Sequence, residues 1–246
     1  MKRVLVVQSR TRPEMLAAEQ AEYTRSVAGS AELTFISSLD ESKPWDSPAE
    51  ILAGYDGVIF GGSGEYDFNG GRDESDPARL TSQQILRRVA PLIEHVFNTE
   101  IPLLGICYGH QIIAELREGN VTNDHSQKKV GTFEVSLTEA GTHDPLFSLL
   151  PADFYAQYGH KDSATTLPKG AELLATGSAC KFAALRYGSR IYTTQFHPEL
   201  RAEDVAWKLE NSPGYLPEGV SVDSLVRDSS EASRIIPLWV EQIVVA

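Results

Sequence analysis

Short apolar runs alternate with longer amphipathic stretches through the first half of the chain. Four of the apolar runs predict strands, and they lie at 4–7, 33–36, 57–60 and 102–105. The first of them is β-branched and continuous, which is typical of a strand buried on both faces. The segments between or after these runs have helical spacing and favour helices at 14–27, 48–53, 78–97 and 109–116. This alternation of strand and helix predicts βαβ units and a parallel sheet covered by helices.

The second half of the chain has a different pattern, with strands that follow one another and few helices between them. The predicted strands lie at 131–137, 153–157, 173–176, 182–187 and 191–195, and a helix is expected at 202–211. We therefore expect an α/β fold with an antiparallel section in its second half, forming one domain over 1–246. Met15, Ala18 and Ala21 or Glu22 recur at helical spacing in the first helix, and Phe97, Trp207 and Trp239 are expected as core anchors.

Composition narrows the class of protein further. The chain has 246 residues, 41% of them hydrophobic and 23% charged, which is typical of a globular protein. A net charge of −12 argues against nucleic acid or an anionic membrane surface as a partner. The longest apolar runs fall far short of the roughly 20 residues that a membrane span needs. Four apolar residues after Met1-Lys2-Arg3 favour a first strand over a signal peptide, so we expect a cytoplasmic protein.

The first candidate for chemistry is the segment GICYGHQ at 105–111. A glycine on each side of a central residue, between an apolar strand and a helix, is typical of a nucleophile elbow, which exposes that residue at a sharp turn. Cys107 would then lie at the first turn of a helix, where the free N–H groups and the helix dipole favour a thiolate. The alternative is a small buried cysteine at a tight turn, since most cysteines are buried.

The second candidate is His197-Pro198-Glu199, at the end of the last predicted strand. A carboxylate two residues after a histidine can hold the imidazole, which can then take a thiol proton and return it to a leaving group. The alternative for this tripeptide alone is a polar turn before the next helix. His110 is on the same helix as Cys107 but points along it, so packing or a hydrogen bond is expected there. The two cysteines and six histidines lack metal-ligand spacing, so no metal or cofactor is expected.

Cys107 and His197 lie 90 residues apart, yet each follows a strand, and the carboxyl ends of parallel strands converge. With GICYGHQ and QFHPE the sequence resembles the class I glutamine amidotransferases over about residues 1–200, leaving 201–246 as a helical C-terminal extension. The resemblance implies a flavodoxin-like, mostly parallel sheet flanked by helices. It also implies a Cys107, His197 and Glu199 triad.

The resemblance extends to other segments. It implies an oxyanion hole made of the Gly62 and Tyr108 backbone amides, although the turn reads GGS where many members have GGP. It implies that Gln111 helps to hold the substrate and that Gly159 and His160 belong to a loop that receives its α-amino and α-carboxyl groups. The Gly- and Asp-rich loop at 63–77 is either a solvated loop or a segment that shapes access to the site.

The predicted reaction is hydrolysis of the γ-carboxamide of L-glutamine through a γ-glutamyl thioester. Ammonia would pass to a separate acceptor or synthetase subunit, because the sequence indicates no fused acceptor domain. Two alternatives remain open. One is a γ-glutamyl peptidase or amide hydrolase that uses the same triad, and the other is a catalytically silent binding or regulatory module.

Overall fold

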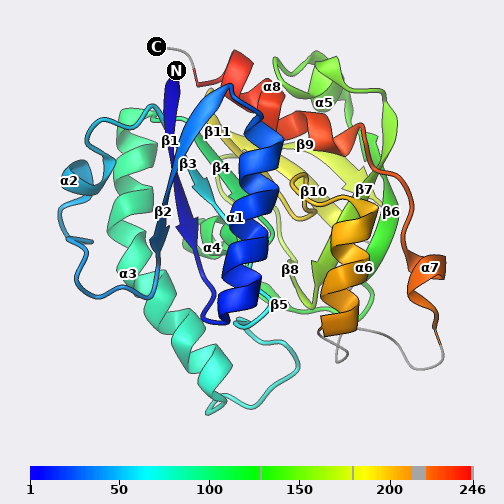
Figure 1. The fold of residues 1–246 in the computed structure, drawn as a ribbon, viewed down its shortest axis with the longest axis horizontal. Helices are drawn as coiled ribbons and strands as arrows, with labels where there is room; N and C mark the ends of the chain where they lie inside the picture. The colour runs from blue at the N-terminus through cyan, green and yellow to red at the C-terminus, as the bar shows by residue number, and fades with distance from the viewer. Residues whose placement is uncertain (128, 179, 212–219, 245–246) are drawn as a thin grey trace.

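The computed structural model describes residues 1–127, 129–178, 180–211 and 220–244. Within them the chain forms one sheet of nine strands, with helices on both faces (Figure 1). In spatial order these strands are β2 (Ala31–Ser37), β1 (Lys2–Gln8), β3 (Gly57–Phe60), β4 (Leu103–Ile106), β11 (Ile191–Thr194), β10 (Cys180–Tyr187), β9 (Ala171–Gly177), β6 (Lys129–Leu137) and β7 (Asp153–His160). A second, two-stranded sheet pairs β5 (Val121–Asn123) with β8 (Asp162–Ala164).

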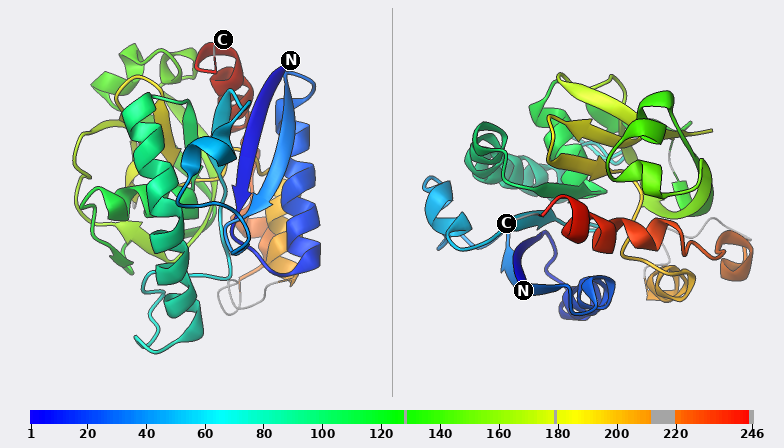
Figure 2. Two further views of the ribbon diagram at one scale, coloured as in Figure 1. Left: turned by 90° about the vertical axis from the view of Figure 1, so that its left-hand side faces the viewer. Right: turned by 90° about the horizontal axis from the view of Figure 1, so that it is seen from above.

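The helices connect these strands and cover both faces of the large sheet. They are α1 (Pro13–Val27), α2 (Pro48–Leu52), α3 (Pro77–Thr99), α4 (Tyr108–Leu116), α5 (Glu139–His143), α6 (Ala202–Asn211), α7 (Val222–Leu225) and α8 (Ile235–Gln242). Figure 2 shows α1 and α8 on one side of the sheet and α3 on the other. Within the described residues, no helix combines the length and the apolar character that crossing a bilayer requires.

The strand order confirms the predicted fold. From β2 to β11 neighbouring strands are parallel, and the order β2-β1-β3-β4-β11 is that of a flavodoxin-like sheet. From β11 to β7 neighbouring strands are antiparallel, as the strand-rich second half of the sequence predicts. The structure is therefore an α/β fold whose parallel half is flanked by helices and whose other half is an antiparallel section.

Strand β1 illustrates how the sheet divides two hydrophobic cores. Val4 and Val6 pack into the core that contains α1 and α8, whereas Leu5 and Val7 pack into the core that contains α3 and α4. Successive side chains of a strand point to opposite faces, so a continuous apolar run is needed where both faces are covered. Trp239 of α8 is fully buried in the first core, as expected.

Several details differ from the expectations. The buried face of α1 includes two glutamates, Glu19 and Glu22, whereas Ala21 is exposed. Both glutamates can be buried because each has a cationic partner: Arg10 pairs with Glu19, and Lys208 pairs with Glu22. Trp207 is not a core anchor, because it lies on the outer side of α6 and is 38% exposed. The expected helical extension at 201–246 contains α6, α7 and α8. Because 212–219 and 245–246 lie outside the described residues, the single domain over 1–246 stays a prediction.

Candidate active site

The two sequence candidates meet because their strands are neighbours. Strands β4 and β11 pair in parallel, with Gly105 opposite Thr193 and Ile106 opposite Thr194. The Cys107 N–H continues this ladder by donating to the Thr194 carbonyl at 2.8 Å. The residues that follow the two strands, Cys107 on one side and Gln195 to Glu199 on the other, therefore emerge side by side at the carboxyl edge of the sheet.

Cys107 occupies the strained turn between β4 and α4. Its φ of 51° and ψ of −96° are unusual for a residue with a side chain, and such a conformation costs of the order of 1–3 kcal/mol. The turn is tight because α4 lies against β3: a Cβ on Gly109 would be 2.3 Å from the Phe60 carbonyl oxygen. The glycine after the cysteine is thus required by close backbone approach, as the elbow motif predicts.

His197 and Glu199 form a buried pair beside this turn. The Nδ1 of His197 lies 2.6 Å from Oε1 of Glu199, and both residues are buried. The His197 backbone N–H donates to the Gln157 carbonyl at 2.8 Å, which ties the end of β11 to β7. Burial by itself lowers the pKa of His197, but the neighbouring Glu199 carboxylate and Cys107 sulfur outweigh this effect and raise the pKa to about 10.

The glycine turn after β3 packs against α4 and His197. The Gly61 N–H donates to the Val7 carbonyl at 3.0 Å, and the Gly61 carbonyl accepts the Gly109 N–H at 3.2 Å, so the turn is tied to β1 and to α4. A Cβ on Gly62 would lie 2.7 Å from Cε1 of His197. Tyr108 is the first residue of α4, a position at which the helix offers its backbone N–H no acceptor.

A small cavity opens next to Cys107. Three of the residues predicted to bind substrate line it, namely Gln111, Gly159 and His160. The rest of the lining comes from the GGS turn, the loop that follows it and the segment around His160: Ser63, Tyr66, Asp67, Lys161 and Asp162. The structure therefore places the predicted substrate-binding residues around one cavity with the cysteine in its wall.

Gln111 and His160 are both held by the backbone at Asp162. The Gln111 amide donates to the Asp162 carbonyl at 2.7 Å, and Nδ1 of His160 lies 3.0 Å from the same oxygen. Burial lowers the pKa of His160 to about 4, so its ring is neutral at pH 7. The expected loop at 158–162 is largely strand, because β7 runs on to His160 and β8 begins at Asp162.

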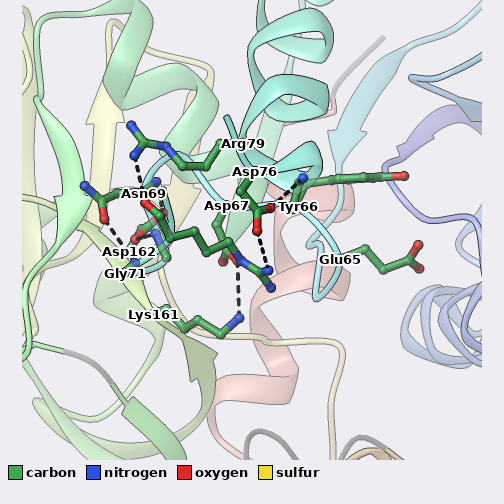
Figure 3. A network of polar contacts seen from close by, with 12 residues as sticks. Glu65, Tyr66, Asp67, Asn69, Gly71, Asp76, Arg79, Lys161 and Asp162 are labelled. Carbon is green, nitrogen blue, oxygen red and sulfur yellow. Dashed lines mark hydrogen bonds and ion pairs between the residues drawn. The ribbon is translucent and has the colours of Figure 1, made fainter. Parts of the chain in front are cut away.

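The loop between β3 and α3 is fixed over this cavity rather than freely solvated. The Asp162 carboxylate accepts the backbone N–H groups of Asn69 at 2.8 Å and Gly70 at 2.6 Å. Asp67 forms ion pairs with Arg72 at 2.9 Å and Lys161 at 3.2 Å, which joins the loop to the turn after β7 (Figure 3). Because Tyr66 and Asp67 line the cavity, the loop forms part of its wall.

Sequence reasoning missed Gln195. Its amide Nε2 lies 3.7 Å from Sγ of Cys107, within hydrogen-bonding distance of a sulfur atom. Its position two residues before His197, at the end of a buried strand, was the available signal. His110 has the expected structural place: it is buried, its Nδ1 lies 2.8 Å from the Thr193 hydroxyl, and burial lowers its pKa to about 3. The described residues contain no cluster of three or more groups suited to hold a metal ion.

Comparison with known proteins fits this geometry. The model of the family "Glutamine amidotransferase class-I" matches residues 41–205, more than half of the chain. Among curated proteins, the chain is 33% identical over 165 residues to a glutamine-hydrolyzing GMP synthase from Parafrankia sp., covering 65% of this chain and 27% of the relative. It is 33% identical over 109 residues to a protein named as one subunit of a glutamine-hydrolyzing GMP synthase from Methanocaldococcus jannaschii, covering 44% of this chain and 56% of the relative.

Two solved structures share the fold. A glutamine amidotransferase from Thermotoga maritima superposes with a TM-score of 0.70 at 19% identity, covering 100% of this chain and 99% of that one. A glutamine amido transferase from Methylobacillus flagellatus superposes with a TM-score of 0.65 at 19% identity, covering 99% and 93%. With the family match over residues 41–205, the chain belongs to the class I glutamine amidotransferase family.

Proposed function

We propose that the protein hydrolyses the γ-carboxamide of L-glutamine to glutamate and ammonia through a γ-glutamyl thioester on Cys107. The observation that carries this proposal is the meeting of three features: a cysteine held at a strained elbow, an adjoining His197, and a Glu199 carboxylate 2.6 Å from that imidazole. A nucleophile, a base and a group that orients the base are the parts that acyl transfer needs.

Each residue has a defined part in the proposed reaction. His197 takes the thiol proton as Sγ of Cys107 forms a bond to the γ-carbonyl carbon, and the C–N bond then breaks while His197 gives that proton to the departing ammonia. Glu199 holds the imidazole and favours its protonated form, in accordance with the raised pKa of His197. Water then attacks the thioester, which releases glutamate and regenerates the thiol.

The oxyanion of the tetrahedral intermediate needs two hydrogen-bond donors that point toward it. The Tyr108 N–H, free at the start of α4, is proposed as the first, and the Gly62 N–H as the second. The Cys107 N–H is unsuited to this role because it already donates to Thr194. Removing one such donor typically costs about 10²–10³ in rate. The glutamyl part is proposed to lie in the cavity lined by Gln111, Gly159 and His160.

The proposed partner is a separate acceptor subunit that takes the ammonia. The support is that several of the curated relatives are named as single subunits of a GMP synthase. The compartment remains the cytoplasm expected from the sequence. The silent-module alternative predicts no turnover, and it is tested by the same experiment as the reaction.

The test combines turnover with covalent labelling. The purified chain is assayed for ammonia release from glutamine, and the glutamine analogue 6-diazo-5-oxonorleucine is used to label the nucleophile. We expect labelling at Cys107 and none at Cys180, because burial raises the pKa of the Cys180 thiol to about 12. Cys107→Ala should abolish both signals. Labelling at Cys180 alone, or neither labelling nor turnover, would overturn the proposal.

A further inference from the structure

A second recess lies beside His197 and adjoins the cavity that Cys107 lines. It has a volume of about 90 Å³, and the two hollows share Ser63 and Gly159 in their walls. Cys107 lines only the smaller hollow, and His197 lines only the larger. A bond that is attacked by Cys107 and whose leaving group is protonated by His197 would therefore lie where the two hollows meet.

The recess is larger than ammonia requires. Ammonia is about the size of a water molecule, which a cavity of about 10–15 Å³ can hold. Most of the wall of the recess is apolar. The apolar side chains come from α1, β6 and the segment that contains α6: Met15, Val130, Leu200, Val205 and Leu209. Such a wall suits an apolar side chain rather than ammonia.

The same recess has two cationic residues in its wall, Arg10 and Lys208, and no carboxylate among the described residues that line it. Nε of Arg10 pairs with Glu19 at 2.9 Å, and its Nη2 lies 3.6 Å from the point where a Cβ on Gly62 would be, close to the glycine turn. Nζ of Lys208 lies 2.9 Å from a Glu22 oxygen. A lysine ammonium has three protons to donate and an arginine guanidinium has five, so each can serve a further acceptor.

The geometry points to a leaving group that is an amino acid with an apolar side chain. The substrate class is then γ-glutamyl dipeptides such as γ-glutamyl-leucine. Its glutamyl half would occupy the Cys107 cavity. Its leucine side chain would contact Val205 and Leu209, and its carboxylate would meet Lys208 or Arg10. This inference rests on the proposed thioester chemistry and extends it from ammonia to amino acids as leaving groups.

The chemical step balances as it does for glutamine. Sγ of Cys107 bonds to the γ-carbonyl carbon, the peptide C–N bond breaks, and His197 donates a proton to the α-amino nitrogen of the departing amino acid. One water molecule then cleaves the thioester. The products of γ-glutamyl-leucine are glutamate and leucine, with the thiol restored.

The test compares three substrates on the purified chain. These are glutamine, γ-glutamyl-leucine, and the γ-glutamyl amide of 3-methylbutylamine, which keeps the leucine side chain but lacks its carboxylate. We expect kcat/KM for γ-glutamyl-leucine to exceed that for the amide by about tenfold or more, because a hydrogen bond to a charged group is lost in the amide.

Two variants separate the apolar wall from the charge. Val205→Phe fills the recess and should lower kcat/KM for γ-glutamyl-leucine at least about tenfold while glutamine hydrolysis stays within about twofold. Lys208→Met should lower the rate for γ-glutamyl-leucine and leave the rate for the amide unchanged. Lys169→Met, which removes an exposed lysine far from the recess, is the matched control and should change neither rate. Thermal melting and active-site labelling establish that each variant is folded; if Lys208→Met does not fold, Val205→Phe and the amide comparison carry the test.

The outcomes distinguish this inference from the proposed function. Glutamine hydrolysis without hydrolysis of γ-glutamyl-leucine would overturn the inference. Equal effects of Val205→Phe on glutamine and on the dipeptide would overturn it too. Failure of all three substrates, together with an unlabelled Cys107, would overturn the proposed function itself.

Discussion

Replacing Gly62 by alanine tests whether the glycine turn positions His197. The new Cβ would lie 2.7 Å from Cε1 of His197, whereas carbon atoms pack at about 3.5–4.0 Å. The imidazole must therefore move by about 0.8 Å or more, or the turn must move by the same amount. A misplacement of about 1 Å can cost about 10² in rate, which is about 2.7 kcal/mol of transition-state stabilisation.

The assay is steady-state ammonia release from glutamine by Gly62→Ala. We expect kcat/KM to fall tens of times to about a hundredfold, while the melting temperature changes by only a few degrees. The alanine keeps its backbone N–H, so the oxyanion donor is not removed, and a loss of activity reports displacement of the ring or of the turn. NMR of the His197 ring should record a changed environment in the variant.

Gly57→Ala is the matched control, because it introduces a similar clash remote from the site. Gly57 is the first residue of β3, the strand that precedes the glycine turn, and its Cβ would lie 3.0 Å from the Trp239 ring. This control should lose stability but keep the kcat of the folded protein. Wild-type activity in a folded Gly62→Ala protein, or an equal loss of kcat in Gly57→Ala, would refute the positioning argument.

Three further predictions concern charges and the loop. Glu199→Gln should lower the pKa of His197, because the carboxylate helps to hold it at about 10, and a titration of the ring by NMR measures the change. Burial lowers the pKa of His110 from 6.5 to about 3, so between these two pH values the folded state binds fewer protons than the unfolded chain. The free energy of unfolding therefore decreases as the pH is lowered through this range, and urea unfolding of His110→Gln should show a weaker decrease at acid pH. Asp162→Ala should free the loop at 65–76, raising KM for glutamine and speeding amide hydrogen exchange in that loop.

The sequence predicts the elements whose signal is local. The four-residue apolar runs correspond to β1 to β4, and the glycines around Cys107 indicate the elbow, because each pattern depends on neighbours within a few residues. The meeting of Cys107 and His197 could also be predicted, since both follow strands of one parallel sheet. The three-residue strands β5 and β8 could not, because so short a segment has no measurable periodicity.

The remaining differences come from partners that are distant in the chain. Glu22 is buried because Lys208 pairs with it, and no helical spacing within α1 could indicate that partner. Gln195 contacts Cys107 through the β4–β11 pairing, so its role depends on register rather than on a motif. The recess beside His197 joins residues of five separate segments, and its apolar wall therefore has no continuous signature in the sequence.

The pairing of β4 with β11 has a consequence for how the protein folds. These strands are separated by most of the second half of the chain, yet β11 is the strand that joins the parallel and antiparallel halves of the sheet. Contacts between segments so far apart form slowly, because closing the long loop between them costs chain entropy before the contacts can offset that cost. During synthesis the nucleophile is made well before its base. Recovery of activity after unfolding therefore reports insertion of β11, and a chain that is cut short before this strand lacks both His197 and Glu199.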